Sequence, residues 1–212
     1  MRRIRFASGG LPVTRILTES DQFREALFAL EMLGRDAGGW TFRRWRKRVG
    51  GHRAVRDLVT MARTVRPFPD MDQIVQRACS PLGGGVRCES EPQLVRDVRE
   101  FHRIAVAPYR DHIDRFLEAD RATRQRIALA HGPEGLLSTL HPSIRWSFPV
   151  LEVPTPHDED MELDTRGLLL SPSIFLTSRS PRVLGPSPDD GIPTLFYPVT
   201  PERGWRMPAR LP

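Results

Sequence analysis

The sequence predicts an α+β fold, in which a mainly helical half precedes a small antiparallel β unit. Apolar residues recur at helical spacing through region 1–140, whereas region 141–200 consists of β-rich runs bounded by Pro, Gly and Asp. Helices and strands do not alternate regularly, which argues against a parallel α/β sheet. We expect about six helices, then the β unit, with region 201–212 as a disordered tail or linker stub; the whole is one composite domain or two small ones.

The first part of the chain is predicted to contain a short extended segment, "RIRF", a glycine-rich loop and then a helix. Ser20 is placed to cap this helix, and Gly34 to end it. Its apolar stripe recurs at helical spacing and comprises Phe23, Leu27, Leu30 and Leu33.

The second helix is expected in "GWTFRRWRKRVGG", residues 39–51. On a helical wheel, Trp45 and Val49 fall within about 60° of Phe42, while the cationic side chains spread over the opposite arc. Those cationic residues are Arg43, Arg44, Lys47 and Arg48. We interpret them as the solvated face of a packed helix. Direct but weak contact with DNA phosphates, or with another anionic ligand, is the alternative that their charge leaves open.

The remaining helices follow the same pattern. A third helix ends before Pro67, a short fourth one runs from Asp70 to Cys79, and "SPLGGGVRCESEP" is a loop. Helical periodicity returns over residues 92–131 with an interruption at Pro108, and a short helix follows Pro133. The β-rich runs are "IRWSFPVLEV", "MELDTRGLLL" and "IPTLFYPV"; their many prolines favour edge strands and turns.

Composition gives broad limits on function. The net charge of +6 favours contact with phosphates or acidic surfaces, but only Lys47 among the 32 basic residues is lysine, so we attribute much of the arginine content to GC-rich codons. Two cysteines are too few for a disulfide scaffold and fit a reducing compartment. Neither a signal peptide nor an apolar membrane span is visible. We therefore expect a cytoplasmic protein without a membrane partner.

No motif for metal or cofactor chemistry stands out. His102 and His112 lie ten positions apart across a proline, which breaks the spacing of a helical metal pair. The acidic run at 157–164 has no calcium-loop glycine and is expected to be a hydrated loop. The sequence contains neither a G-x-S-x-G elbow nor a P-loop. We therefore expect no metal and no cofactor.

A small-molecule pocket is the remaining possibility for a site in the interior. We place it at the junction of helices and sheet, because pockets form at such seams. The residues that we assign to it are His102, Tyr109, His141, Arg145 and Trp146. The alternative is that Trp146 belongs to the core and His141 to a turn.

Several blocks resemble one family. "FHRIAVAPYRDHIDRFLEADRA", "GLLSTLHPSIRWSFPVLEVPTP", "RGLLLSPSIF" and "TLFYPV" look like the N-terminal region of actinobacterial winged-helix transcriptional regulators labelled ArsR-like, as do "IRFASGGLPVTRI" and "ALFALEML". The resemblance covers most of the chain. It implies a dimerising or effector-sensing module upstream of a DNA-binding winged helix.

This chain stops at "PVTPERGWRMPARLP", where the winged helix of that family would begin. We therefore expect either a fragment of a regulator or a stand-alone protein that lacks its own DNA-binding domain. The favoured function is effector binding and homodimerisation, with DNA contacted only indirectly or weakly. The alternative is a small-molecule-binding protein or a cofactor-independent enzyme of secondary metabolism, with His102, Tyr109 or His141 as acid or base.

Overall fold

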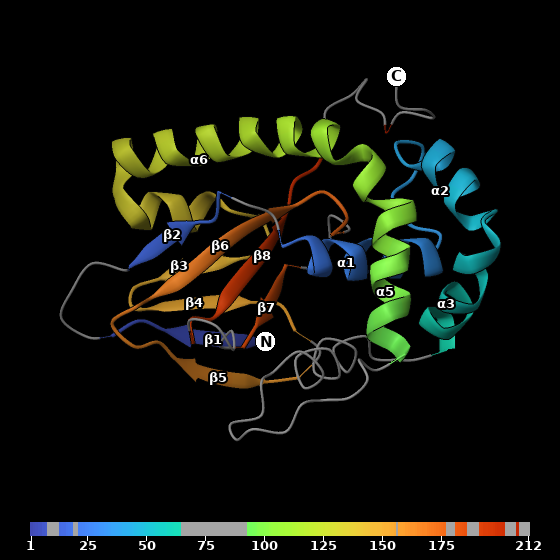
Figure 1. The fold of residues 1–212 in the computed structure, drawn as a ribbon. Coiled ribbons are helices and arrows are strands. Elements are labelled where there is room, and N and C mark those ends of the chain that lie inside the picture. The colour runs from blue at the N-terminus through green and yellow to red at the C-terminus, as the bar shows by residue number, and fades with distance from the viewer. Residues whose placement is uncertain are drawn as a thin grey trace, which may run out of the picture. The chain divides into compact units, whose positions relative to one another are not determined.

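A computed structural model of the chain describes residues 1–7, 13–18, 21–64, 93–155, 157–176, 181–185, 191–201 and 207. The chain forms two units, one of Met1–Ser20 with Ile113–Thr200 and the other of Asp21–His112 with Pro201–Pro212. We call them the β unit and the helical unit (Figure 1). The short helix expected from Asp70 to Cys79, the loop after it and nearly all of the expected tail lie outside the described residues.

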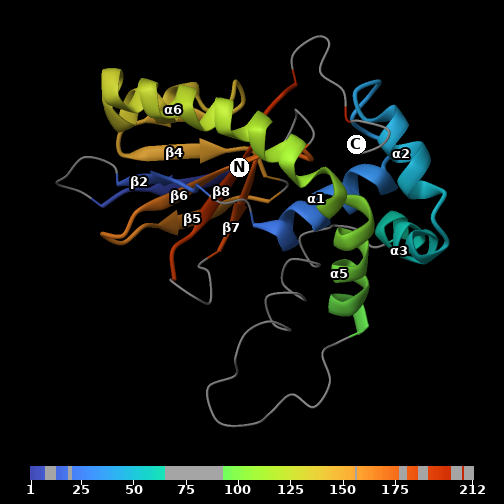
Figure 2. The same ribbon diagram turned by 45° about the horizontal axis from the view of Figure 1, so that its top comes forward.

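The helical unit contains most of the described helices (Figures 1 and 2). They are α1 (Gln22–Gly34), α2 (Arg43–Gly50), α3 (Arg53–Thr64), α5 (Gln93–Ala105) and the 3-10 turn η1 (Ala107–Tyr109). Helix α6 (Arg110–Thr139) follows and lies mostly in the β unit. The strands are β1 (Arg2–Arg5), β2 (Thr14–Ile16), β3 (Arg145–Ser147), β4 (Val150–Val153), β5 (Glu159–Glu162), β6 (Leu168–Ser173), β7 (Arg182–Leu184) and β8 (Thr194–Pro198).

Helix α1 begins one residue later than predicted. Its N-cap is Asp21, whose carboxylate accepts a hydrogen bond of 2.9 Å from the backbone N–H of Arg24, so the assignment of the cap to Ser20 was wrong. An aspartate at this position satisfies a free amide and also interacts favourably with the helix dipole. The helix ends at Gly34, as predicted.

The apolar face of α2 lies in the core, as the helical wheel predicts. Phe42, Trp45 and Val49 are 3%, 0% and 2% exposed. The indole Nε1 of Trp45 donates a hydrogen bond of 2.7 Å to the backbone oxygen of Ala105, at the end of α5. This bond satisfies the polar atom of a fully buried tryptophan and ties α2 to α5.

Two interruptions of the helical pattern were also predicted. Pro108 lies within η1, which separates α5 from α6. In α6, Gly132 has φ 69° and ψ −176° and is followed by Pro133, so the long element is two helical segments joined at a kink. Glycine tolerates this positive φ, and proline cannot continue the preceding hydrogen-bond ladder.

The strands form two small mixed sheets, with orders β3-β4-β1-β5 and β2-β6-β8-β7. The prediction of an antiparallel unit that follows all the helices was therefore wrong in two respects. Strands β1 and β2 precede the helices and join the sheets, and β1 pairs in parallel with β5, as β6 does with β2 and β8. Parallel partners are distant in sequence, so local periodicity does not reveal the pairing.

The middle of the acidic run at 157–164 is a strand rather than part of the expected hydrated loop. This strand, β5, lies beside β1 in a register that sets Arg2 opposite Glu159 and Arg3 opposite Asp160. Arg2 forms an ion pair with Glu159, and Arg3 forms one of 3.4 Å with Asp160. The carboxylates are exposed, so the ion pairs add little to the stability of the sheet. Their main effect is to favour the register in which opposite charges lie across from each other.

Pro172 lies in β6, an inner strand, although prolines were expected at edges. The backbone N–H of Leu168 and the carbonyl of Leu170 both form hydrogen bonds on the side of β2, so the nitrogen of Pro172 faces that side as well. Strand β2 pairs only with Leu168–Leu170. The missing donor of Pro172 therefore falls beyond the end of β2, where no ladder bond is lost.

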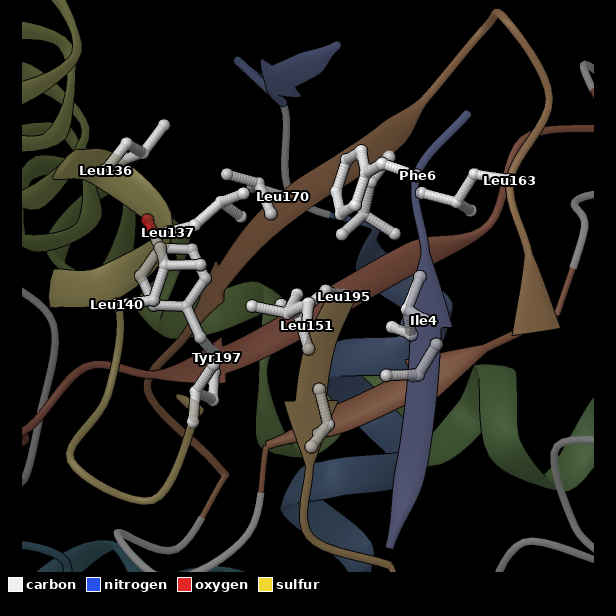
Figure 3. Packing of buried hydrophobic residues seen from close by; sticks show 14 residues of the cluster. Ile4, Phe6, Leu136, Leu137, Leu140, Leu151, Leu163, Leu170, Leu195 and Tyr197 are labelled. Atoms are coloured by element: carbon white, nitrogen blue, oxygen red, sulfur yellow. The ribbon is translucent and has the colours of Figure 1, made fainter. Parts of the chain in front are cut away.

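The core of the β unit lies between the two sheets and the last turns of α6 (Figure 3). Ile4 and Leu151 of one sheet face Leu170 and Leu195 of the other. Tyr197 is also fully buried, and its hydroxyl donates a hydrogen bond of 2.8 Å to Asp120 of α6. Burial and the charge of Asp120 raise the pKa of Tyr197, so the phenol remains a donor that attaches α6 to β8.

We predict that Trp45→Phe destabilises the protein by about 2 kcal/mol, because the carbonyl of Ala105 loses its donor and a small cavity is left. The same replacement at Trp40, whose side chain is 52% exposed, is expected to change the free energy of unfolding by less than about 0.5 kcal/mol. Urea unfolding of both variants measures the difference, and equal effects would contradict the packing of α2.

Candidate functional site

The positive charge of the chain is concentrated in one short segment. Between residues 39 and 63 the sequence has eight cationic residues and a single acid, Asp57, for a net charge of +7. The complete chain carries +6, so the remainder is close to neutral. The cationic residues are Arg43, Arg44, Arg46, Lys47, Arg48, Arg53, Arg56 and Arg63. A general preference for arginine over lysine would not by itself produce this local excess of cations.

Five of these cations line one groove of about 560 Å³. It lies between α2, α3 and the end of α1, within the helical unit. Its cationic lining residues are Arg43, Arg46, Lys47, Arg56 and Arg63. Among the described residues of the lining, Asp36 is the one acid; the others are Leu33, Gly50, Val59 and Thr60. We call this surface the basic groove.

Helical spacing brings the cations to the groove. Arg43 and Lys47 are four residues apart and share one side of α2. Arg56 and Arg63 are seven residues apart and share one side of α3. The apolar faces of both helices are buried, and only two residues, Gly51 and His52, connect them. Part of the polar face of each helix therefore lines the groove, whereas Arg44, Arg48 and Arg53 do not line it.

Two arginines brace the groove against the C-terminal end of α1. Arg46 forms an ion pair of 2.9 Å with Asp36 and donates to the backbone oxygen of Ala37. The Nε of Arg63 donates a hydrogen bond of 3.2 Å to the backbone oxygen of Gly34. Guanidinium groups are favourable here because the last carbonyls of a helix are unsatisfied and carry partial negative charge.

The other cations of the groove have no such partner. The side chains of Arg43, Lys47 and Arg56 are exposed and form no ion pair or hydrogen bond with any residue that the structure describes. Cations at this spacing repel one another, and an anion in the groove would relieve that repulsion. The arrangement suits a ligand that presents several negative charges.

A second, smaller hollow adjoins the groove at the start of α2. It has a volume of about 320 Å³ and is lined by Trp40, Thr41, Arg43, Arg44 and Met207. Arg43 lines both concavities, so the two form one cationic surface. The exposed Trp40 makes this end of the surface aromatic as well as basic.

The four cations singled out from the sequence do not all lie together. Arg43 and Lys47 line the groove, and Arg44 lines the hollow. Arg48 lines neither, and its charge acts instead on the hydroxyl of Tyr109. The contribution of Arg56 and Arg63 was missed. Their seven-residue spacing places both on the polar side of α3, and this spacing could have indicated their position from the sequence.

The predicted small-molecule pocket is divided between the two units. His102 and Tyr109 belong to the helical unit. Burial lowers the pKa of His102, and the charge of Arg110 lowers it further. Burial raises the pKa of Tyr109, against the opposing effect of Arg48. Both groups are therefore held in their neutral forms.

The other three residues belong to the β unit. His141 is half-buried in the turn before β3, where its Nδ1 accepts a hydrogen bond of 3.2 Å from the N–H of Ser143. Trp146 contacts Phe6 edge to face at a centroid distance of 5.3 Å, and Arg145 beside it is exposed. These contacts account for His141 and Trp146 as turn and packing residues. A ligand-binding role for the five residues stays a prediction.

Comparison with family models, with curated proteins and with solved structures gave no match. The ArsR-like relationship therefore stays a prediction.

Within the described ranges, no three His, Cys, Asp or Glu side chains gather as they would around a metal ion. No helix in those ranges combines the length and apolar character needed to cross a bilayer.

We predict that His102 makes the protein less stable at mildly acidic pH. Since its folded pKa lies below the ordinary value of about 6.5, the unfolded chain takes up this proton first as the pH falls. Neutral His102 therefore makes its full contribution to the free energy of unfolding above about pH 6.5. This contribution is lost as the pH falls from there through the lower pKa of the folded state. His102→Gln is expected to remove this component, as measured by urea unfolding across the range. NMR titration of the His102 ring with a pKa at or above about 6.5 would contradict the prediction.

Proposed function

We propose that the helical unit binds the phosphate backbone of a nucleic acid in the basic groove. The observation that carries the proposal is the convergence of Arg43, Lys47 and Arg56, all exposed and without a partner among the described residues, on one concave surface. Positively charged grooves attract phosphates, and the release of counterions drives binding.

The distribution of the charge favours a chain of phosphates over a single small anion. A site for one phosphate converges on one point, whereas the cations here are spread along two helices and continue past Arg43 to Arg44. Contacts of arginine and lysine with phosphates fix a protein on the backbone of a nucleic acid and carry no direct information on base sequence. We therefore propose binding that depends little on base sequence.

The regulator resemblance is a separate proposal. An effector-binding and dimerising module of a transcriptional regulator would act near DNA, and backbone contacts from its helical unit would add affinity without supplying specificity. The basic groove supports contact with nucleic acid. It gives no support to a particular effector, to a dimer or to catalysis.

We expect the variant Arg43→Gln/Lys47→Gln/Arg56→Gln to bind nucleic acid much more weakly. The plot of log affinity against log salt has a negative slope, and each phosphate contact adds about 0.7 to 0.9 to its magnitude. Three lost contacts should therefore make the slope less steep by about two to three. Fluorescence anisotropy with labelled single-stranded and duplex oligonucleotides at several salt concentrations measures the slope.

The matched control is Arg126→Gln, which removes an exposed arginine from α6, outside the groove. It should leave the slope close to that of the wild type. The proposal fails if the wild-type protein binds neither oligonucleotide, or if the control makes the slope less steep by about 0.7 to 0.9, the share of one phosphate contact.

A further inference from the structure

We infer that the occupant is single-stranded nucleic acid, with one base stacked on Trp40. This inference rests on the proposed function and adds to it the strandedness of the ligand. It depends on the hollow at the start of α2, where an exposed tryptophan lies beside two arginines that have no partner among the described residues.

The backbone before α2 turns Trp40 outward. Gly38 and Gly39 both have positive φ, 83° and 55°, and a Cβ on Gly38 would lie 2.7 Å from the ring of Phe42. The tight turn thus lets Phe42 enter the core, while Trp40 stays 52% exposed.

The hollow offers a flat apolar surface and positive charge together. Its lining combines the indole of Trp40 and the thioether of Met207 with the guanidinium groups of Arg43 and Arg44. Its volume of about 320 Å³ is at the lower end of ligand pockets, which are about 300–1,000 Å³. Base stacking on aromatic side chains, together with a basic track for the backbone, is the way that proteins hold single strands.

The geometry also favours a single strand over a duplex. In a duplex the faces of the bases are stacked on one another, and only their edges and the phosphates are accessible to a rigid surface. A single strand can place one base on Trp40, and its phosphates can then follow Arg43 into the basic groove. The same residue joins the two parts of the surface, so the path is continuous.

The test is the effect of Trp40→Ala on affinity for an oligothymidine of about 12 nucleotides and for a duplex of the same length. We expect the affinity for the single strand to fall about five-fold or more, since stacking is lost. The slope of log affinity against log salt should stay at the wild-type value, because no cation is removed. The affinity for the duplex should stay the same within two-fold. Trp40→Phe should restore most of the loss, and circular dichroism checks that both variants fold.

The outcomes separate this inference from the proposed function. If Trp40→Ala leaves the affinity for oligothymidine unchanged while the triple groove variant lowers it, base stacking is wrong and backbone binding stands. If Trp40→Ala weakens single-strand and duplex binding equally, or if the wild type prefers the duplex, the inference is overturned as well. If the wild type binds neither nucleic acid, both proposals fail together.

Discussion

The burial of Trp45 is the constraint on which the helical unit's cationic surface depends. An eight-residue helix that carries five cations is too short and too highly charged to be stable alone. Its fully buried indole, bonded to the backbone oxygen of Ala105, holds it in place. Once Trp45 is inside, the direction of each neighbouring side chain follows from the helical period. Arg43 and Lys47 then line the basic groove, Arg44 lines the hollow, and the charge of Arg48 reaches Tyr109.

The groove remains cationic because only part of its charge is offset. Arg63 donates a hydrogen bond to the carbonyl of Gly34, the last residue of α1, and Arg46 donates one to the carbonyl of Ala37 just after the helix. Asp36 balances the charge of Arg46. These contacts hold α2 and α3 against the C-terminal end of α1 and so position the sides of the groove. They leave the outer cations exposed to solvent, where their mutual repulsion is weak but adds to the attraction for an anion.

Features set by nearby residues were predictable, and those set by distant partners were not. The buried face of α2, the end of α1 at Gly34 and the breaks at Pro108 and Gly132 each depend on residues within a few positions. Strand β5 depends on β1, more than 150 residues away, so its acidic sequence alone suggested a loop. For the site, the sequence suggested Arg43, Arg44, Lys47 and Arg48 as possible anion contacts, and Arg48 lines neither concavity. The cations that α3 contributes, Arg56 and Arg63, were not predicted, because only the apolar side of that helix entered the prediction.

The pairing of arginines elsewhere in the chain bears on whether the groove is an accident of composition. Arg2 and Arg3 lie opposite acids across a strand pair, while Arg103 and Arg166 each bond a nearby carboxylate and thereby lower the pKa of Glu100 and of Asp164. Had arginine merely been the habitual surface residue of this sequence, acids would be expected among the groove cations as well. Instead, residues 39–63 contain one acid for eight cations. Two groove arginines, Arg46 and Arg63, bond the end of α1, but the exposed Arg43, Lys47 and Arg56 have no partner among the described residues. That is the pattern expected of a surface that an external polyanion neutralises.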